Sequence, residues 1–376
     1  MKRTASINLF LSATISLLLF ACKKGFNDTQ TNPLLNESKQ RSSLTSLTAH
    51  PIYIGGTEGG VAKYWVDNSG TITSVSLNGN MVTGIVVTGG HVYVSGAATN
   101  PATGLPCAAY WTDTNPTPVY LPYVPKPGFP TETSYASGIA VVGGHVYVTA
   151  RVSAFLNIAV YYVDGVQVDL DPTGTQGGGE PNGISADGTN LYIVNSGALS
   201  YWKVDVSDPA NPVTTKVTLP PATGHTASAV AIAAYGGTVY TAGLYGGSTP
   251  KAIRWINNGT PVELNAQTGS RAFAIAANAS GSVVAGTGWT DFNNQKIGYW
   301  DYVGAPDFFG AGAQLTAYMG ITTDPATGEV FVCGSEKEPG SSQAKAKYWV
   351  RGGSFAVHTL NSGSADAYAY CIALGQ

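Results

Sequence analysis

Charged side chains are scarce in this sequence. The chain has 376 residues, of which 19 are Lys or Arg and 22 are Asp or Glu, so 11% are charged. An average globular domain contains about 25%. The formal net charge is −3, and nucleic acids are bound mainly by basic surfaces that neutralise phosphates. The composition therefore argues against DNA or RNA as a partner.

Long apolar stretches with helical spacing are also absent. Where other proteins use Lys and Glu, this chain uses Ser, Thr, Asn, Tyr and 47 glycines. These residues are typical of strands and tight turns and are poor helix formers. The composition therefore predicts an all-β fold.

Several sequence signatures of enzymes are missing. There is no Gly-x-Ser-x-Gly nucleophile elbow, no metal-binding histidine motif and no phosphate-binding glycine loop after a strand. The five histidines are scattered along the chain. The sequence predicts no metal and no cofactor, and it leaves catalysis undecided, with a non-catalytic role favoured.

Cysteine is rare too, at four residues. Cys107, Cys333 and Cys371 are odd in number, and their spacing matches no zinc knuckle. Buried free thiols are the favoured interpretation. A disulfide between two of them is the alternative in an exported protein, and the sequence does not say which two would pair.

The fourth cysteine follows an apolar segment at the N-terminus. Lys2 and Arg3 precede a stretch that ends at Ala21 and is too short to span a bilayer. The sequence LLFAC at residues 18–22 resembles the lipobox of bacterial lipoproteins, which implies a signal peptide over residues 1–21 and lipid attachment at Cys22. An ordinary secretory signal cleaved nearby is the alternative.

The lipoprotein resemblance also implies a location. Lys23, rather than Asp, follows the cysteine, which in the sorting scheme of these lipoproteins favours the outer membrane, on its periplasmic or outer side. Residues 22–48 are polar and aperiodic, as expected for a flexible tether. The membrane is therefore an expected partner, through the lipid on Cys22, and residues 49–376 form the expected folded domain.

This domain is repetitive. The sequence GGHVYV occurs at residues 89–94 and again at 143–148, and an aromatic pair recurs at a spacing of about 47 residues. In the third strand of each repeat, such pairs are expected to fill the gaps between neighbouring sheets, and a ring of aromatic binding sites is the alternative. The pairs are Tyr64-Trp65, Tyr110-Trp111, Tyr161-Tyr162, Tyr201-Trp202, Tyr299-Trp300 and Tyr348-Trp349, and Arg254-Trp255 is a seventh instance with one member changed.

One repeat contains four strand-like segments separated by turns. From Val82 onward they are VTGIVV, VYVSGAA, AAYWTD and VYLPY. Units of four strands repeated four to eight times are the signature of a β-propeller. The sequence therefore predicts an all-β, seven-bladed β-propeller with four antiparallel strands per blade.

The two ends of the domain predict how the ring closes. Residues Pro51–Gly56 look like a second strand without a first, and Ala367–Gly375 look like a first strand without a second. We expect the C-terminal strand to complete the first blade. Each repeat combines paired glycines with Val-Tyr and Tyr-Trp sequences. This combination resembles kelch-like and other bacterial extracellular propeller repeats. In kelch repeats the paired glycines end a strand, whereas in this chain they precede the second strand.

Propeller ligands usually bind where strands enter the central channel. The register places one residue of each innermost strand facing this channel, namely Thr83, Ser137, Asn182, Val230, Phe273, Met319 and Tyr370. Polar residues at the rim and in its loops either bind a ligand or only contact water. Trp289 either stacks on a sugar or covers the blade below it. The candidate ligand-binding residues are Tyr135, Glu180, Asn182, His225, Arg271, Trp289 and Tyr368.

The sequence thus favours a lipid-anchored propeller of the cell envelope that binds a carbohydrate or a protein partner. This rests partly on the fold, which is a weak guide to function. One alternative is a glycosidase or lyase that uses the central channel, and another is a structural subunit of an envelope complex.

Overall fold

The computed structural model describes most of the predicted domain. The described residues are 50–124, 133–153, 158–170, 179–196, 198–222, 224–247, 249–264, 268–290, 295–309, 319–337, 340–351, 356–361 and 363–375. The chain divides into two compact units, Met1–Ser46 and Leu47–Gln376, and the described residues belong to the second. The predicted signal peptide, Cys22 and tether lie outside them. None of the described segments is a helix that could span a membrane.

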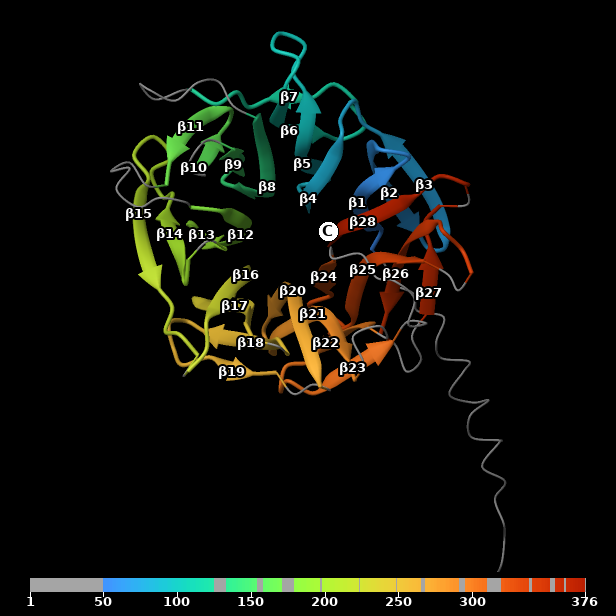
Figure 1. Ribbon diagram of the computed structural model, residues 1–376. Helices are drawn as coiled ribbons and strands as arrows, with labels where there is room; N and C mark the ends of the chain where they lie inside the picture. The colour runs from blue at the N-terminus through green and yellow to red at the C-terminus, as the bar shows by residue number, and fades with distance from the viewer. Residues whose placement is uncertain are drawn as a thin grey trace, which may run out of the picture. The chain divides into compact units, whose positions relative to one another are not determined.

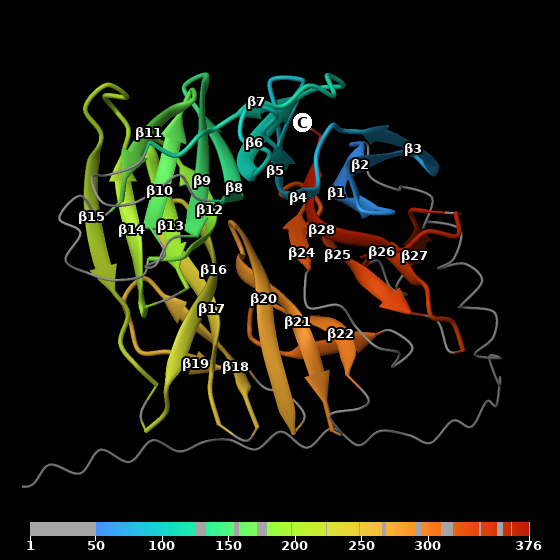
Figure 2. The same cartoon turned by 45° about the horizontal axis from the view of Figure 1, so that its top comes forward.

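The second unit is a seven-bladed β-propeller, as the repeats predict. Within the described residues, seven four-stranded antiparallel sheets form a ring around a central axis (Figure 1). Figure 2 shows the same ring tilted, with β16, β20 and β24 among the strands nearest the axis. Short Gly-containing turns join many of the strands, and Gly89 and Gly90 adopt the positive φ that such turns require.

Each blade has one strand next to the axis and three further out. From the innermost strand outward, the strands of the first four blades are β28 (Ala367–Leu374), β1 (Ile52–Glu58), β2 (Val61–Asn68) and β3 (Thr71–Ser76) in blade 1; β4 (Met81–Thr88), β5 (His91–Thr99), β6 (Pro106–Thr112) and β7 (Val119–Tyr120) in blade 2; β8 (Thr133–Val142), β9 (His145–Ser153), β10 (Ile158–Val163) and β11 (Val166–Asp169) in blade 3; and β12 (Pro181–Asp187), β13 (Asn190–Asn195), β14 (Ser200–Asp205) and β15 (Val213–Thr218) in blade 4.

The remaining blades follow the same order. They are β16 (Ala227–Tyr235), β17 (Thr238–Tyr245), β18 (Lys251–Ile256) and β19 (Val262–Glu263) in blade 5; β20 (Gly269–Asn278), β21 (Gly281–Trp289), β22 (Lys296–Trp300) and β23 (Pro306–Phe309) in blade 6; and β24 (Gly320–Thr323), β25 (Val330–Lys337), β26 (Ala344–Val350) and β27 (Ala356–Thr359) in blade 7.

The ring closes through its C-terminal strand. β28 pairs antiparallel with β1, from Ile52 opposite Leu374 to Glu58 opposite Ala367. The last strand of the chain is thus the innermost strand of the first blade, which confirms the predicted closure. Because both ends share one sheet, blade 1 has four strands like the other six blades, and β28 covers the edge of β1.

The aromatic pairs pack between blades. Tyr64 of blade 1 and Trp111 of blade 2 share one hydrophobic cluster, and Tyr348 of blade 7 shares another with Trp65 of blade 1. Both tryptophans are at most 1% exposed. The two residues of a pair point to opposite faces of the sheet, so each pair contributes to two interfaces. The packing interpretation is confirmed, and the aromatic pairs are not a ring of exposed binding sites.

Arg254 takes the place of tyrosine in blade 5. Its side chain is 8% exposed and reaches blade 6, where Nη1 donates to the carbonyl oxygens of Ser282 at 3.1 Å and Tyr302 at 3.3 Å. Burial lowers the pKa of the guanidinium. The carbonyl groups compensate part of the cost of burying this charge.

The three cysteines of the propeller are free thiols, which was the interpretation that the sequence favoured over a disulfide. Cys107 and Cys333 are buried, and the thiol of Cys371 lies against Gly55. Burial raises the pKa of Cys333 to about 12 and that of Cys371 well above its ordinary value. These thiols therefore remain protonated at neutral pH, which makes them poor nucleophiles.

Candidate functional site

A β-bulge in the innermost strand shapes the channel. In β4, Val82 lies opposite Gly96 and Gly84 lies opposite Ser95, so Thr83 is an extra residue without a partner on β5. Bulges of this kind redirect one side chain and bend the strand. Similar irregularities occur in β8, β12, β16, β20 and β28. The residues in the bulges are Thr83, Ser137, Asn182, Val230, Phe273 and Tyr370.

Glycine next to the bulge allows the first two strands to approach closely. A Cβ atom on Gly96 would lie 1.9 Å from the carbonyl oxygen of Met81, and one on Gly286 would lie 2.0 Å from that of Arg271. Real Cβ atoms do not come this close to backbone atoms. The bulge therefore depends on glycine at these positions.

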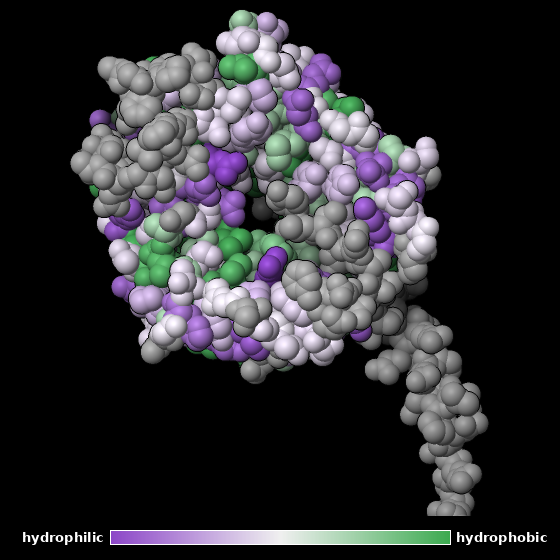
Figure 3. Space-filling view, in the orientation of Figure 1, coloured by the Kyte–Doolittle hydropathy of each residue, from purple (hydrophilic) through white to green (hydrophobic). Residues whose placement is uncertain are grey.

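All six bulge residues line a central cavity of about 1130 Å³. Met319, which directly precedes β24 in blade 7, lines it as well. The seven residues that the sequence register points toward the channel therefore surround one cavity. Figure 3 shows the hollow at the centre of the ring.

The cavity has a polar wall and an apolar wall. Blades 2, 3 and 4 contribute Thr83, Ser137 and Asn182 in succession. The next three blades contribute the apolar residues that complete the ring: Val230, Phe273 and Met319. In Figure 3 the hollow has hydrophilic atoms at its upper left and hydrophobic atoms along its lower edge. A ligand that fills this space needs one polar and one apolar side.

Hydrogen bonds fix the side chains of the polar wall. Ser137 Oγ donates to Thr149 Oγ1 at 3.0 Å, and Asn182 Nδ2 donates to the carbonyl oxygen of Val230 at 2.8 Å. The Asn182 contact also joins blade 4 to blade 5. Because these groups are already oriented, a ligand would lose less entropy in ordering them.

An ion pair bridges blades 3 and 4 at this wall. Arg151 Nη1 lies 3.6 Å from Glu180 Oε1, and Ser196 Oγ donates to Glu180 Oε2 at 3.3 Å. The two charged side chains are 44% and 33% exposed, so both remain open to solvent and to a ligand. The pair presents a cation and an anion side by side within the cavity.

Two tyrosines of β28 lie on the blade 1 side. The rings of Tyr368 and Tyr370 are stacked, with centroids 6.3 Å apart and planes 2° from parallel. Tyr370 Oη and Thr57 Oγ1 are hydrogen-bonded at 3.3 Å. Burial raises the pKa of the Tyr368 hydroxyl. The Tyr368 hydroxyl is therefore neutral at pH 7 and can donate or accept a hydrogen bond.

A second carboxylate lines the cavity. Asp366, just before β28, accepts a hydrogen bond from the backbone N–H of Ala344 at 2.7 Å through Oδ1. Among the described residues that line it, the cavity therefore contains two acids, Glu180 and Asp366. Within the described part of the chain, no group of three or more His, Cys, Asp or Glu side chains is placed to hold a metal ion.

The structure divides the seven predicted site residues among three places. Tyr135, Glu180, Asn182 and Tyr368 line the central cavity. Arg271 and Trp289 line a different cavity, between blades 5 and 6. His225 lines neither of the two and stacks on Tyr245, with ring centroids 4.4 Å apart.

Trp289 is 4% exposed at the end of β21. Its ring packs against its own blade and does not project from an exposed loop. A Cβ atom on Gly269 would lie 2.3 Å from the Trp289 ring, so the ring rests on the backbone of β20.

Arg151 is the main residue of the cavity that the sequence register missed. It lies on β9, directly opposite Tyr135 of β8. Apart from Trp289, at the end of the second strand of blade 6, the predicted site residues come from the innermost strands and their loops. Extending the register to the second strand of blade 3 would have placed Arg151 beside Tyr135.

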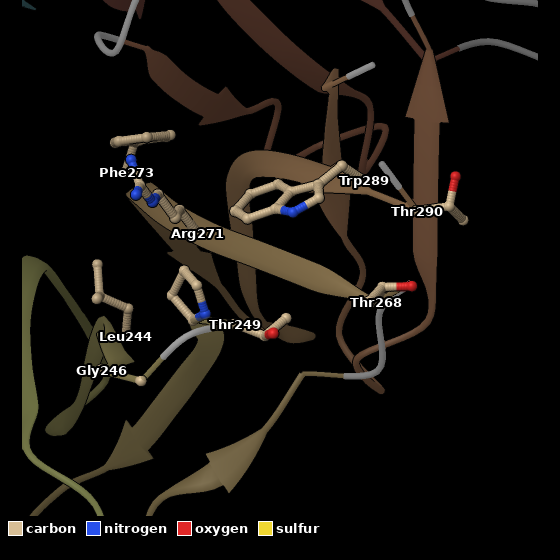
Figure 4. A pocket seen from close by; sticks show the side chains of 10 residues that line it. Leu244, Gly246, Thr249, Thr268, Arg271, Phe273, Trp289 and Thr290 are labelled. Carbon is tan, nitrogen blue, oxygen red and sulfur yellow. The ribbon is translucent and has the colours of Figure 1, made fainter. Parts of the chain in front are cut away.

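The cavity between blades 5 and 6, which we call the interblade pocket, has a volume of about 800 Å³ (Figure 4). Phe273 lines both this pocket and the central cavity, so the two adjoin at that residue. The residues around the interblade pocket are Leu244, Gly246, Gly247, Thr249, Pro250, Thr268, Arg271, Phe273, Trp289 and Thr290.

The sequence matches no protein-family model and no curated protein. Similar solved structures include a functionally unknown protein from Desulfotomaculum acetoxidans, with 11% identity, a TM-score of 0.48 and coverage of 87% of this chain and 99% of that one. TolB from Acinetobacter baumannii has 12% identity, a TM-score of 0.44 and coverage of 93% and 89%.

The GH43 endo-arabinanase from Bacillus licheniformis has 14% identity, a TM-score of 0.34 and coverage of 59% and 95%. At identities this low, a similar structure carries no information about the function of this chain. The comparisons therefore assign no activity to this chain.

Proposed function

We propose that this propeller is a carbohydrate-binding module of the cell envelope and that its ligand occupies the central cavity. The observation that carries the proposal is the two-sided lining, with Thr83, Ser137 and Asn182 facing Val230, Phe273 and Met319 across one space. A volume of about 1130 Å³ is enough for a short oligosaccharide.

Sugars match this lining chemically. A pyranose ring has hydroxyl groups that need hydrogen-bond partners and C–H faces that pack on apolar or aromatic surfaces. The polar wall offers amide, hydroxyl, guanidinium and carboxylate groups, which include both donors and acceptors. The aromatic rings of Phe273, Tyr368 and Tyr370 offer surfaces for the C–H faces.

A glycosidase is the alternative to the binding role, and the acids of the cavity are the residues it would need. Of the two acids among the described residues of the cavity, Glu180 contacts Arg151 and Ser196, and Asp366 accepts a backbone N–H. Each carboxylate is thus held by groups of the protein. A glycosidase needs two carboxyl groups that flank the bond to be cleaved. The contacts of Glu180 and Asp366 are explained by structure and ligand binding without a catalytic role.

The proposal predicts binding that depends on the stacked tyrosines. The propeller unit, residues 47–376, would be tested against a panel of envelope and plant polysaccharides. We expect Tyr368→Ala to weaken binding about tenfold or more, because a ring that stacks on a sugar is lost. Tyr235→Ala, at an exposed turn end on β16, is the matched control and should bind like wild type.

Two outcomes would contradict sugar binding in the cavity, and a third would contradict a purely binding role. One is the absence of binding to any member of the panel, which would direct the search to protein partners captured from envelope extracts. The other is equal binding by the wild type and the Tyr368→Ala variant. Shortened sugar products in the incubations would show that the module is an enzyme.

Anchoring through a lipid on Cys22 is part of the same proposal, and it rests on the lipobox-like LLFAC at residues 18–22. A lipid anchor would keep the module at the outer membrane. Cells that express the full chain should incorporate radioactive palmitate into it, and Cys22→Ser should abolish the label. A Cys22→Ser chain that is labelled like wild type would refute the anchor.

A further inference from the structure

The interblade pocket holds one charged side chain among the described residues that line it, and that side chain is Arg271. The rest of the lining is apolar, glycine or threonine, with hydroxyl groups from Thr249, Thr268 and Thr290. In the described part of the chain, no carboxylate forms an ion pair with Arg271. Among the described residues, the pocket thus presents a cation without a counter-ion.

The sheet register explains how Arg271 is held. Gly269 of β20 pairs with Trp289 of β21, and Arg271 pairs with Thr287, so Arg271 and Trp289 are diagonal neighbours on one face of the sheet. The guanidinium carbon lies 5.8 Å from the centroid of the Trp289 ring, in a cation–π contact. Figure 4 shows the two side chains together, with Leu244 across the pocket from them.

The tryptophan itself is firmly placed. Its 4% exposure and its contact with Gly269 leave it no room to move toward β20. Hydrogen bonds between blades support the base of the pocket, since Ser270 N donates to Pro250 O at 2.9 Å and Ser270 Oγ accepts from Ala252 N at 2.9 Å. Arg271 therefore rests on a rigid aromatic surface.

A guanidinium that stacks on an aromatic ring keeps its N–H groups free at its edge. Their fork geometry matches the two oxygens of a carboxylate, and such charge-assisted pairs are stronger than neutral hydrogen bonds. The three threonine hydroxyls can bind sugar hydroxyl groups, and Leu244 and Phe273 can pack against a C–H face. The lining as a whole suits a sugar that bears a carboxylate.

We propose that the interblade pocket is a subsite for the carboxylate of an acidic sugar, and that the ligand of this propeller is a uronate-containing oligosaccharide. The second half of the inference rests on the proposed function. Phe273 lines both cavities, so one chain of sugars can occupy the two together. A sugar acid in the interblade pocket would then belong to the same oligosaccharide that fills the central cavity.

The experiment compares one oligosaccharide in two charge states. Tetragalacturonate and its methyl ester would be titrated into the propeller unit, which forms a compact unit of its own, by calorimetry at fixed ionic strength. We expect wild type to bind the acid about tenfold or more tightly than the ester. Arg271→Gln should remove this preference.

Lys216→Gln is the matched control, because it removes one positive charge from an exposed position of the outer strand β15. It should keep the preference for the acid. Galacturonic acid alone is a second probe, since one sugar can occupy the interblade pocket without the central cavity. By saturation-transfer NMR it should bind wild type and Lys216→Gln, and not Arg271→Gln. Circular dichroism and the melting temperature verify that Arg271→Gln is folded.

Four results would overturn the inference. Equal affinity for acid and ester would mean that no carboxylate is recognised, while the proposed function would stand. A preference retained in Arg271→Gln would place the carboxylate elsewhere. Wild type that binds neutral oligosaccharides but neither galacturonate probe would also exclude the subsite. Failure of all sugars, neutral and acidic, would overturn the proposed function together with this inference.

Discussion

A chain that ends at Asp366 is expected not to fold. It lacks β28, which is the innermost strand of blade 1 and pairs with the whole of β1. Ala367 and Ala369 are fully buried, and Ile372 is 7% exposed in the cluster between blades 7 and 1. Removing them opens the ring, exposes the edge of β1 and leaves a hydrophobic interface without its cover.

The expected loss in the free energy of unfolding exceeds the whole stability of an ordinary domain, which is about 5–15 kcal/mol. The truncated chain should accumulate as insoluble protein, or show no cooperative melting by circular dichroism. Removal of residues 22–46 is the matched control, because they belong to the other compact unit, and it should leave the melting temperature unchanged. A truncated chain that is soluble and melts like wild type would show that closure is not required.

The second large effect is expected in alkali, where the propeller should unfold between about pH 10 and pH 12. The hydroxyl groups of Tyr64, Tyr161 and Tyr299 are buried between blades, and burial raises the pKa of each to about 12. Burial also raises the pKa of Tyr162 and Tyr348, and the hydrogen bond to Asp67 adds to the effect for Tyr348.

The numbers of protons that the folded and the unfolded states bind determine how stability changes with pH. In the unfolded chain these tyrosines lose their protons near pH 10, whereas the folded protein keeps them until about pH 12. Between these values the folded state binds more protons, so its stability falls as the pH rises. Below pH 10 the tyrosines contribute no pH dependence. At about pH 12, each tyrosine with a raised pKa lowers the free energy of unfolding by on the order of 2 kcal/mol.

Absorbance of phenolate at 295 nm, followed together with circular dichroism, measures this effect. We expect one cooperative step in which the buried tyrosines ionise as the strand signal is lost. Tyr162→Phe should move that step to higher pH without loss of stability at pH 7, because the buried Tyr162 hydroxyl has no hydrogen-bond partner among the described residues. Full ionisation near pH 10 with an unchanged strand signal would contradict the account.

The architecture could be predicted from the sequence because each blade repeats the same packing problem. A Tyr-Trp pair must fill two interfaces in every blade, so the pair marks the third strand wherever it occurs. Tyr348 and Trp65, which are 283 positions apart, meet because the ring closes between them. The strand at Ala367–Leu374 was predictable from the same repeat, since Pro51–Gly56 needed a partner.

The candidate site was predictable only in part. The register identified the inward residues, because one position of each repeat faces the channel in all blades. It did not reveal the bulges, which are a property of pairing between strands. Nor did it show that Arg271 and Trp289 are diagonal neighbours that face the interblade pocket. Contacts across strands, such as that between Arg151 and Glu180, require the folded structure.

The central claim is that a sugar binds in the cavity ringed by the bulge residues. Its most direct test is a crystal structure of the propeller unit soaked with the oligosaccharide that binds best. We predict electron density for the sugar between the polar wall at Asn182 and the apolar wall at Phe273, with a ring against Tyr368 or Tyr370. Density on the outer surface of the blades, with the cavity holding only water, would contradict the claim.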